Sequence, residues 1–364
     1  MTQALTRRSA SRLLLGLPFA SLGLTGHPSS SDAAPYVQNA GLVAPVRSEP
    51  PVALAPTDVR YTSSNESYEM IEGIVIYRGQ AVQMMSGSPS LAAPLVQAIN
   101  RYQQELAPEV SVYFMAIPIG SDFYLPDKLT RGVMREKILI DGAYARLNPG
   151  VRAVAAYDPM AEHADEYLYF NTDHHWTGLG AYYAYTAFAK AARFNPLPLS
   201  ALTKADLGNF LGTLYSRTKS QALKDRGDKI ECYKIPRKTE VTVFNGASRT
   251  GTAGRLYFEY ARGRNSYGVF LGGDYPLMRI RSDVNNNRKI VVIKDSYGNA
   301  FVPYLAAHYQ EVYVIDYRHY KGNIRQLIRD NKIKEVVFAH NNFVVCNKFA
   351  AKQAHLFLDN PNPA

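Results

Sequence analysis

A buried strand, a polar turn and a helix follow one another in KIVVIKDSYGNAFVPYLAA, residues 289–307. Residues 290–293 are apolar at every position, which is typical of a strand that is covered on both faces in a parallel sheet. Further strands are expected at 312–315 and 335–339, with a helix at 323–329 between them. This alternation of strands and helices predicts a parallel sheet with helices on its faces.

The residues before this block extend the same α/β pattern. We expect a strand at 71–76, a helix at 91–106, a strand at 110–117, short strands at 151–157 and 167–170, and a helix at 179–193. Glycine-rich short runs between 200 and 288 suggest hairpins. The sequence therefore predicts one α/β domain over residues 66–350, with a β-rich insertion at 200–288 and a C-terminal tail at 351–364.

The N-terminus has the order of a secretory signal. A basic stretch at 6–12 precedes an apolar run at 13–24 and small residues near Ala33. We expect residues 1–33 to be a signal peptide, 34–65 to be an extended Pro-rich linker, and the protein to be periplasmic or extracellular. The pair Arg7-Arg8 leaves twin-arginine export open. A permanent membrane anchor is the other interpretation, but twelve apolar residues fall short of the ~20 that a spanning helix needs.

Composition narrows the classes of partner. The 364 residues carry 41 Lys and Arg against 31 Asp and Glu, a net charge of +10, and 46% of them are hydrophobic, which excludes a disordered chain. A basic surface suits nucleic acid, anionic lipid or an acidic glycan, and export argues against nucleic acid. The two cysteines, Cys232 and Cys346, either form a disulfide or remain separate buried thiols.

The densest polar cluster is NTDHHWT, residues 171–177. A carboxylate two residues before a histidine can orient an imidazole, so Asp173 and His175 suit a general base whose outer nitrogen is free. Neighbours in an extended segment point to opposite sides, so His174 is expected to face away and to be structural. A metal site made from these residues is the alternative, although no HExxH or Cys-pair spacing supplies further ligands.

A nucleophile and an oxyanion site have candidates elsewhere. Ser296 follows the strand at 289–294 and precedes a helix, where backbone N–H groups favour developing negative charge. A serine at this position either caps the helix or acts as the nucleophile. Gly272-Gly273-Asp274 forms either a simple turn or a source of backbone N–H groups for an oxyanion.

Together, three motifs resemble a known family. The segments TDHHW (172–176), FLGGD (270–274) and VVIKDSY (291–297) are similar to those of DHHW proteins, exported members of the SGNH hydrolase-like group that includes the alginate O-acetyltransferases. The resemblance implies a three-layer, flavodoxin-like parallel sheet. It implies Ser296 as nucleophile, His175 as general base and Asp173 as the group that orients it, with an oxyanion hole from the Ser296 N–H and Gly272 or Gly273.

The resemblance also implies a function. An exported acyltransferase or acylesterase would act on an extracytoplasmic polysaccharide, with O-acetylation through an acyl-serine, no cofactor and no metal, and a membrane-bound O-acyltransferase as donor. Arg318 would hold an anionic sugar or face solvent, Tyr297 would line the substrate site, and Trp176 would either line it or pack beneath the loop. The alternative is a catalytically inactive carbohydrate-binding or polysaccharide-assembly protein.

The chain departs from the pattern of the wider group at two points. Lys294 replaces the glycine that usually precedes Asp-Ser, which removes a flexible position before the nucleophile. The asparagine of the wider group has no certain counterpart, and Asn299, Asn341 and Asn342 are the candidates.

Overall fold

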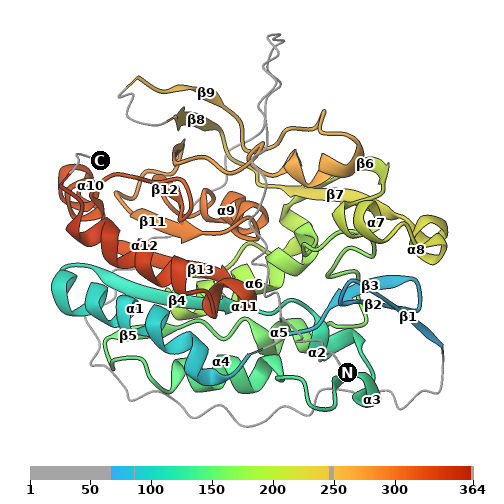
Figure 1. Ribbon diagram of the computed structural model, residues 1–364. Coiled ribbons are helices and arrows are strands. Elements are labelled where there is room, and N and C mark those ends of the chain that lie inside the picture. Colours follow the sequence, from blue (N-terminus) through green and yellow to red (C-terminus); the bar gives the residue numbers. More distant parts are fainter. Residues whose placement is uncertain (1–66, 86, 246–249, 362–364) are drawn as a thin grey trace, which may run out of the picture. The chain divides into compact units, whose positions relative to one another are not determined.

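The computed structural model describes residues 67–85, 87–245 and 250–361 (Figure 1). The predicted signal peptide (1–33) and the predicted Pro-rich linker (34–65) lie outside these residues, as do 362–364 of the predicted tail. Within the described ranges, no helix combines the length and the apolar character that crossing a bilayer requires.

The core of the fold is a mixed sheet of eight strands. Five neighbouring strands run parallel, in the spatial order β5 (Val151–Ala153), β4 (Ser111–Ile117), β13 (Glu335–Asn341), β11 (Lys289–Lys294) and β12 (Glu311–Asp316). Three antiparallel strands continue it, in the order β10 (Leu277–Ser282), β8 (Thr239–Phe244) and β9 (Thr252–Gly254). The chain is therefore a mixed α/β protein with a large, mostly parallel central sheet, as the strand pattern predicts.

Strand β11 lies in the middle of this sheet, and its residues 290–293 are at most 1% exposed. Burying each of these Ile and Val side chains contributes about 1.5–3 kcal/mol, which explains why an uninterrupted apolar run becomes a central strand. In register, Lys294 lies opposite Asp316 of β12 and Ala339 of β13. The segments that follow these three strands consequently meet at one edge of the sheet.

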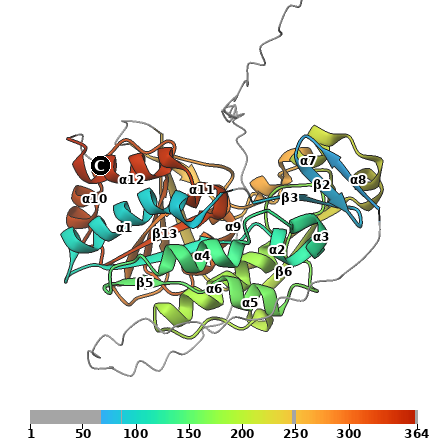
Figure 2. The same ribbon diagram turned by 60° about the horizontal axis from the view of Figure 1, so that its bottom comes forward.

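Helices lie on both sides of the parallel strands. Figure 2 shows α1 (Ala93–Leu106), α10 (Ile324–Asn331) and α12 (Lys348–Asp359) on one side, and α5 (Tyr157–Glu162) and α6 (Gly178–Ala191) on the other. Helix α9 (Gly298–Leu305) packs against α6. The shorter helices are η1 (Pro89–Ala92), α2 (Ser121–Tyr124), α3 (Asp127–Thr130), α4 (Glu136–Tyr144), η2 (Leu199–Ala201), α7 (Thr213–Thr218), α8 (Gln221–Arg226), η3 (Gly263–Val269) and α11 (Asn342–Val345).

Four local predictions differ from the structure. Residues 351–359 belong to α12, which buries Ala351, Ala354 and Phe357 beside α1, so they are not a tail.

The expected strand at 71–76 is split into β1 (Tyr68–Ile71) and β2 (Ile74–Tyr77), followed by β3 (Gln80–Gln83). Residues 72 and 73 have φ of 51° and 76°, the geometry of a tight hairpin turn. The segment 167–170 forms only an isolated bridge between Tyr169 and Trp176.

The fourth difference concerns residues 200–288. Only β6 (Thr203–Phe210) and β7 (Asp228–Lys234) form a separate two-stranded sheet, whereas β8, β9 and β10 extend the central sheet. Cys232 lies in β7 and Cys346 follows α11, and both are free thiols, so the disulfide alternative is wrong.

Candidate active site

The Asp-His-His-Trp loop is a tight turn that leads into α6. The Phe170 N–H donates to the His175 carbonyl, and the Thr177 N–H donates to the Leu168 carbonyl, so the two sides of the loop are tied together. The Thr177 hydroxyl then caps α6 by accepting from the Gly180 N–H. The loop is thereby fixed to a helix end, with its polar side chains at the tip.

Three side chains of the predicted site form a continuous hydrogen-bonded chain. Asp173 Oδ1 lies 2.6 Å from His175 Nδ1, and His175 Nε2 lies 2.8 Å from Ser296 Oγ. Asp173 and His175 are 3% and 6% exposed, so little water competes for these bonds. The structure thus brings together two motifs that are 121 positions apart, in the order carboxylate, imidazole, hydroxyl.

Ser296 does not cap the helix that follows it. It lies in the turn between β11 and α9, and the N-cap position of α9 belongs to Tyr297. The Ser296 hydroxyl is directed to His175, and its N–H has no acceptor among the described residues. Both groups are therefore available for chemistry.

The carboxylate of Asp173 is held from its other side by α7. Asp173 Oδ2 accepts from the Thr213 N–H and from the Thr213 hydroxyl, each at 2.9 Å. A Cβ on the preceding Gly212 would lie 2.4 Å from Asp173 Cβ, so this close approach requires glycine. Burial alone would raise the pKa of Asp173, but the two adjacent imidazoles and the donated hydrogen bonds hold it well below its usual range.

A second carboxylate, Asp228, fixes the beginning of the loop. It accepts from the Asn171 N–H at 2.6 Å, the Thr172 N–H at 2.7 Å, the Thr172 hydroxyl and the Tyr167 hydroxyl. Asp228 is 4% exposed and opens β7. Neither Asp228 nor Thr213 is apparent from the sequence, because each acts on a loop some 40 to 57 positions earlier without any local pattern.

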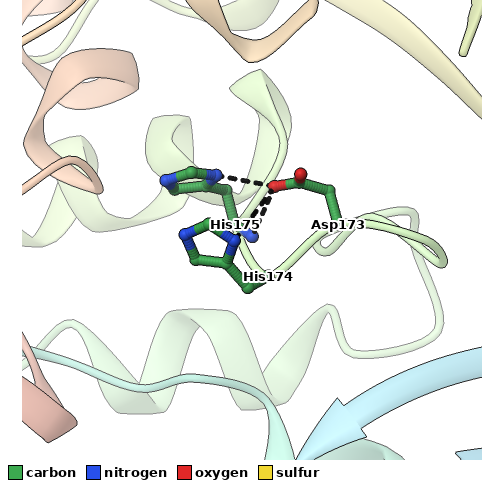
Figure 3. Close-up of side chains that lie close together, drawn as sticks. All are labelled: Asp173, His174 and His175. Carbon is green, nitrogen blue, oxygen red and sulfur yellow. Dashed lines mark hydrogen bonds and ion pairs between the residues drawn. The ribbon is translucent and has the colours of Figure 1, made fainter. Parts of the chain in front are cut away.

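His174 lies beside His175 instead of facing away from it, contrary to prediction. The two rings have centroids 3.8 Å apart and planes tilted by 38° (Figure 3). The alternation of an extended strand does not apply because residues 171–175 form a bend. His174 Nδ1 lies 2.7 Å from Thr213 Oγ, and its side chain is 36% exposed.

Aromatic residues surround His175. Trp176 is fully buried, and its ring N–H donates to the Tyr297 carbonyl at 2.9 Å. Tyr297 is 3% exposed, and its hydroxyl donates to the His174 carbonyl. Both residues therefore pack beneath the loop, which is one of the two alternatives for Trp176 and leaves Tyr297 little surface for a substrate. Tyr267 of η3, which the sequence does not single out, stacks on the face of His175.

The backbone hydrogen bonds distinguish between the two glycines that could serve as an oxyanion donor. The Gly272 N–H donates to the Gly268 carbonyl at 3.1 Å, so it is already used. The Gly273 N–H, like that of Ser296, has no acceptor within the described ranges. Of the predicted pair, Gly273 alone remains suitable for an oxyanion.

Lys294, at the end of β11 and two residues before Ser296, is the centre of a buried ionic network. Its Nζ lies 2.6 Å from Asp274 Oδ1 and 3.0 Å from Asp316 Oδ2, and its side chain is 1% exposed. The Arg318 guanidinium binds both of these carboxylates, at 2.6 and 2.7 Å. Arg318 therefore binds two carboxylates of this network while its side chain remains 35% exposed, and its role in holding an anionic sugar stays a prediction.

The candidate asparagines have separate partners. Asn299 Nδ2 donates to Asp274 at 3.0 Å, Asn342 Nδ2 donates to Glu136, and Asn341 caps α11. Asn299, in the first turn of α9, therefore belongs to the same network as the glycine motif. The other two stabilise the segment after β13.

Asp173, His174 and His175 also offer ligand atoms within 4.8 Å of one another, the arrangement of a three-ligand metal site. Each Asp173 oxygen already accepts two hydrogen bonds, and both His175 ring nitrogens have partners. A metal ion would have to displace these bonds, so the donor set fits the hydrogen-bonded network better than a metal centre.

Comparison with known proteins agrees with this architecture. The family model described as DHHW protein matches residues 33–315. A DHHW family protein from Eubacterium siraeum is 25% identical, with a TM-score of 0.73 over 82% of this chain and 99% of that chain. Bacillus cereus PatB1, solved with a sulfonyl adduct, is 21% identical, with a TM-score of 0.63 over 78% and 98%.

A third structure is more distant. The O-acetyltransferase domain of Pseudomonas putida AlgJ is 12% identical, with a TM-score of 0.40 over 79% of this chain and 98% of that domain, a score too low to carry any conclusion. Among curated proteins, no sequence matches the chain. The first two likenesses show that the large, mostly parallel sheet with its helices is a shared fold.

Proposed function

The chain belongs to the DHHW family, and from its site we propose that it is a serine acyltransferase or acylesterase that forms an acyl-serine at Ser296. The observation that carries this proposal is the chain of two hydrogen bonds from Asp173 through His175 to Ser296, of 2.6 and 2.8 Å. A hydroxyl aligned with a base that a carboxylate orients is the arrangement that activates a serine nucleophile.

In the first half of the reaction, Ser296 Oγ attacks the acyl carbonyl while His175 Nε2 takes its proton. The oxyanion faces the N–H groups of Ser296 and Gly273. His175 then donates the proton to the leaving alcohol, and the acyl group stays on Ser296. Asp173 remains ionised, because its low pKa favours the carboxylate, and it stabilises the imidazolium that forms in between.

In the second half, a hydroxyl group attacks the acyl-serine. His175 Nε2 takes the proton of this hydroxyl and returns it to Ser296 Oγ as the new ester is released. Water in place of an alcohol gives hydrolysis. The same residues thus perform both halves, and the identity of the incoming hydroxyl decides between transferase and esterase.

We extend the proposal to the setting of the reaction. The sheet and its flanking helices would be the three-layer arrangement of SGNH hydrolase-like proteins. The basic and apolar segments at 6–24 support export, and an extracytoplasmic polysaccharide would receive or lose acetyl groups. A membrane-bound O-acyltransferase would supply the acyl group in the transferase case.

The test is acyl turnover by the full chain. With p-nitrophenyl acetate, we expect a burst of nitrophenol followed by slow turnover, and a loss of at least about a hundredfold in Ser296→Ala. Ser111→Ala is a suitable control, because the Ser111 side chain makes no hydrogen bond with a described residue. Equal rates in Ser296→Ala and the wild type would disprove the nucleophile.

A second measurement does not depend on turnover. Phenylmethylsulfonyl fluoride should modify Ser296, as detected by peptide mass spectrometry, and labelling should disappear in His175→Ala. The relative PatB1 has been solved with a sulfonyl adduct, which motivates this reagent. If the wild type showed no burst and no labelling, the carbohydrate-binding alternative would be favoured.

A further inference from the structure

The mechanism above uses one of the two adjacent histidines and leaves His174 without a role. This ring lies against His175, is 36% exposed, and lines a crevice beside the loop. The crevice is shallow and open to solvent, and it lies between Gln80 and Gln83 of β3 and the residues Tyr124 and Tyr169. His174 is thus a partly exposed polar group beside His175.

The protons of the surrounding groups determine which nitrogen of His174 carries hydrogen. Asp173 is an ionised carboxylate, so the hydroxyl proton of Thr213 must point to Asp173 Oδ2. Thr213 Oγ can then only accept from His174, and His174 Nδ1 must be the donor. Nε2 of His174 consequently bears a lone pair, and no described residue lies within hydrogen-bonding distance of it.

The charge of His174 agrees with this assignment. Burial and the neighbouring imidazole of His175 lower the pKa of His174 to about 4. The ring is therefore neutral at neutral pH, and its Nε2 acts as an acceptor.

The two imidazoles present their outer nitrogens in the same direction. In Figure 3 both rings turn one nitrogen toward Asp173 and the other away from it, to a common side. On that side His175 Nε2 meets Ser296 Oγ. The two rings, tilted by 38° with centroids 3.8 Å apart, therefore offer two acceptors beside Ser296.

We infer that His174 Nε2 accepts a hydrogen bond from a second hydroxyl of the acceptor alcohol, so that the site selects vicinal diols such as those of sugar rings. This inference rests on the proposed function. The reacting hydroxyl gives its proton to His175 Nε2 as its oxygen bonds to the acyl carbon. The carbon–Oγ bond breaks and Ser296 recovers the proton. The adjacent hydroxyl keeps its own proton and donates it to His174, which orients the attacking oxygen.

The test compares two small acceptors that differ in one hydrogen-bond donor. Ethylene glycol carries a second hydroxyl, whereas in 2-methoxyethanol a methyl ether replaces it. The full chain is acylated with p-nitrophenyl acetate in the presence of each alcohol, and the ratio of ester formed to acetate released is measured. For each alcohol, this ratio is divided by the number of free hydroxyls in the molecule, two in ethylene glycol and one in 2-methoxyethanol. We expect the wild type to favour ethylene glycol by about fivefold, the effect of about one hydrogen bond.

Two variants of His174 make the comparison specific. In His174→Asn the side-chain amide can still donate to Thr213, but nothing replaces Nε2, so the preference for ethylene glycol should vanish. In His174→Gln the amide oxygen reaches the place of Nε2, so part of the preference should return. The ratio is taken within each variant, so a change in overall rate or in the amount of folded protein does not affect it.

Three results would overturn the inference: no preference in the wild type, an unchanged preference in His174→Asn, or release of acetate alone with both alcohols. In all three, acyl turnover still depends on Ser296. If turnover did not depend on Ser296, the proposed function itself would fail, which is a distinguishable outcome.

Discussion

The Tyr267 ring lies flat on the His175 ring, with centroids 3.7 Å apart and planes 5° from parallel. The Tyr267 hydroxyl donates to the backbone carbonyls of Ser296 and Tyr297, at 2.9 and 3.1 Å. One side chain thus holds both the His175 ring and the turn that carries Ser296. An aromatic face also attracts a cation, so the stack would favour the His175 imidazolium of the proposed mechanism.

Tyr267→Leu should lower kcat about 2- to 30-fold, corresponding to the 0.5–2 kcal/mol of a cation–π contact. Tyr267→Phe keeps the ring and loses only the two hydrogen bonds, so its kcat should stay closer to that of the wild type. Steady-state kinetics of both variants with p-nitrophenyl acetate measures the difference. Equal losses in the Leu and Phe variants would show that the stack contributes nothing.

Gly212→Ala should strongly reduce turnover, because the new methyl group would lie 2.4 Å from Asp173 Cβ and push the carboxylate away from His175. Gly268→Ala is the matched control, since the nearest atom to its added Cβ is 3.9 Å away. Turnover and melting temperature are compared for both variants. Retention of full activity by Gly212→Ala would mean that the loop can shift without cost.

Asp228 predicts a pH dependence of stability. Burial raises the pKa of Asp228 from 3.8 to about 6. A carboxyl that binds its proton more tightly in the folded state stabilises the fold most below about pH 4, and this contribution is lost as the pH rises to about 6. The loss amounts to about 3 kcal/mol of unfolding free energy.

Asp228→Asn should lack this part of the pH dependence. The NH2 group of the asparagine would also face the N–H and hydroxyl donors of Thr172, so stability and activity should be lower at every pH. Urea unfolding of the wild type and Asp228→Asn between pH 4 and pH 7 measures how the free energy of unfolding of each protein depends on pH. The pKa of buried Glu136 is also raised, to about 7, but it contributes equally to both proteins. If the free energy of unfolding changed with pH in the same way in both proteins, the prediction would be contradicted.

Lys294→Met should lower the free energy of unfolding by about 3–5 kcal/mol, because Asp274 and Asp316 would lose the buried cation between them. Burial alone would raise the pKa of Asp274, but Lys294 and Arg318 hold it well below its usual range, so the pair is ionised. Since Asp274 follows Gly273, we also expect kcat to fall more than KM rises.

Lys289→Met provides the comparison on the same strand. Lys289 pairs with Glu311 at 3.2 Å, but its side chain is 22% exposed, and partly exposed pairs contribute about 0–1 kcal/mol. Denaturant unfolding of both variants measures the contrast. A similar loss of unfolding free energy in both variants would show that the buried network stabilises the fold no more than the partly exposed ion pair does.

The sequence predicted the framework well where the signal was local. The apolar run at 290–293 can form only a buried strand or a buried helix, and flanking turn residues decide for the strand, so β11 was expected at 289–294 as observed. The pairing of Asp173, His175 and Ser296 followed from motif resemblance. The hairpin of β1 and β2 was missed, because Glu72 gives no indication that it will adopt a positive φ.

The supports of the site were not predictable in the same way. Thr213 and Asp228 act through hydrogen bonds to a loop that is distant in sequence, and Tyr267 acts through a stack. Such contacts leave no periodicity and no spacing rule. The orientation of His174 was predicted wrongly, since alternation along an extended segment fails where the backbone bends.

Several of the groups that hold the Asp-His-His-Trp loop lie outside the motif, among them Thr213, Asp228 and the Gly212 N–H, which donates to the Thr172 hydroxyl at 2.8 Å. Transplanting the motif alone to another α/β scaffold would therefore move the reactive side chains without their supports. An engineer who wishes to graft this chemistry must carry residues 212–213 and 228 with it, and a shortened version of this protein must keep the whole of 203–234.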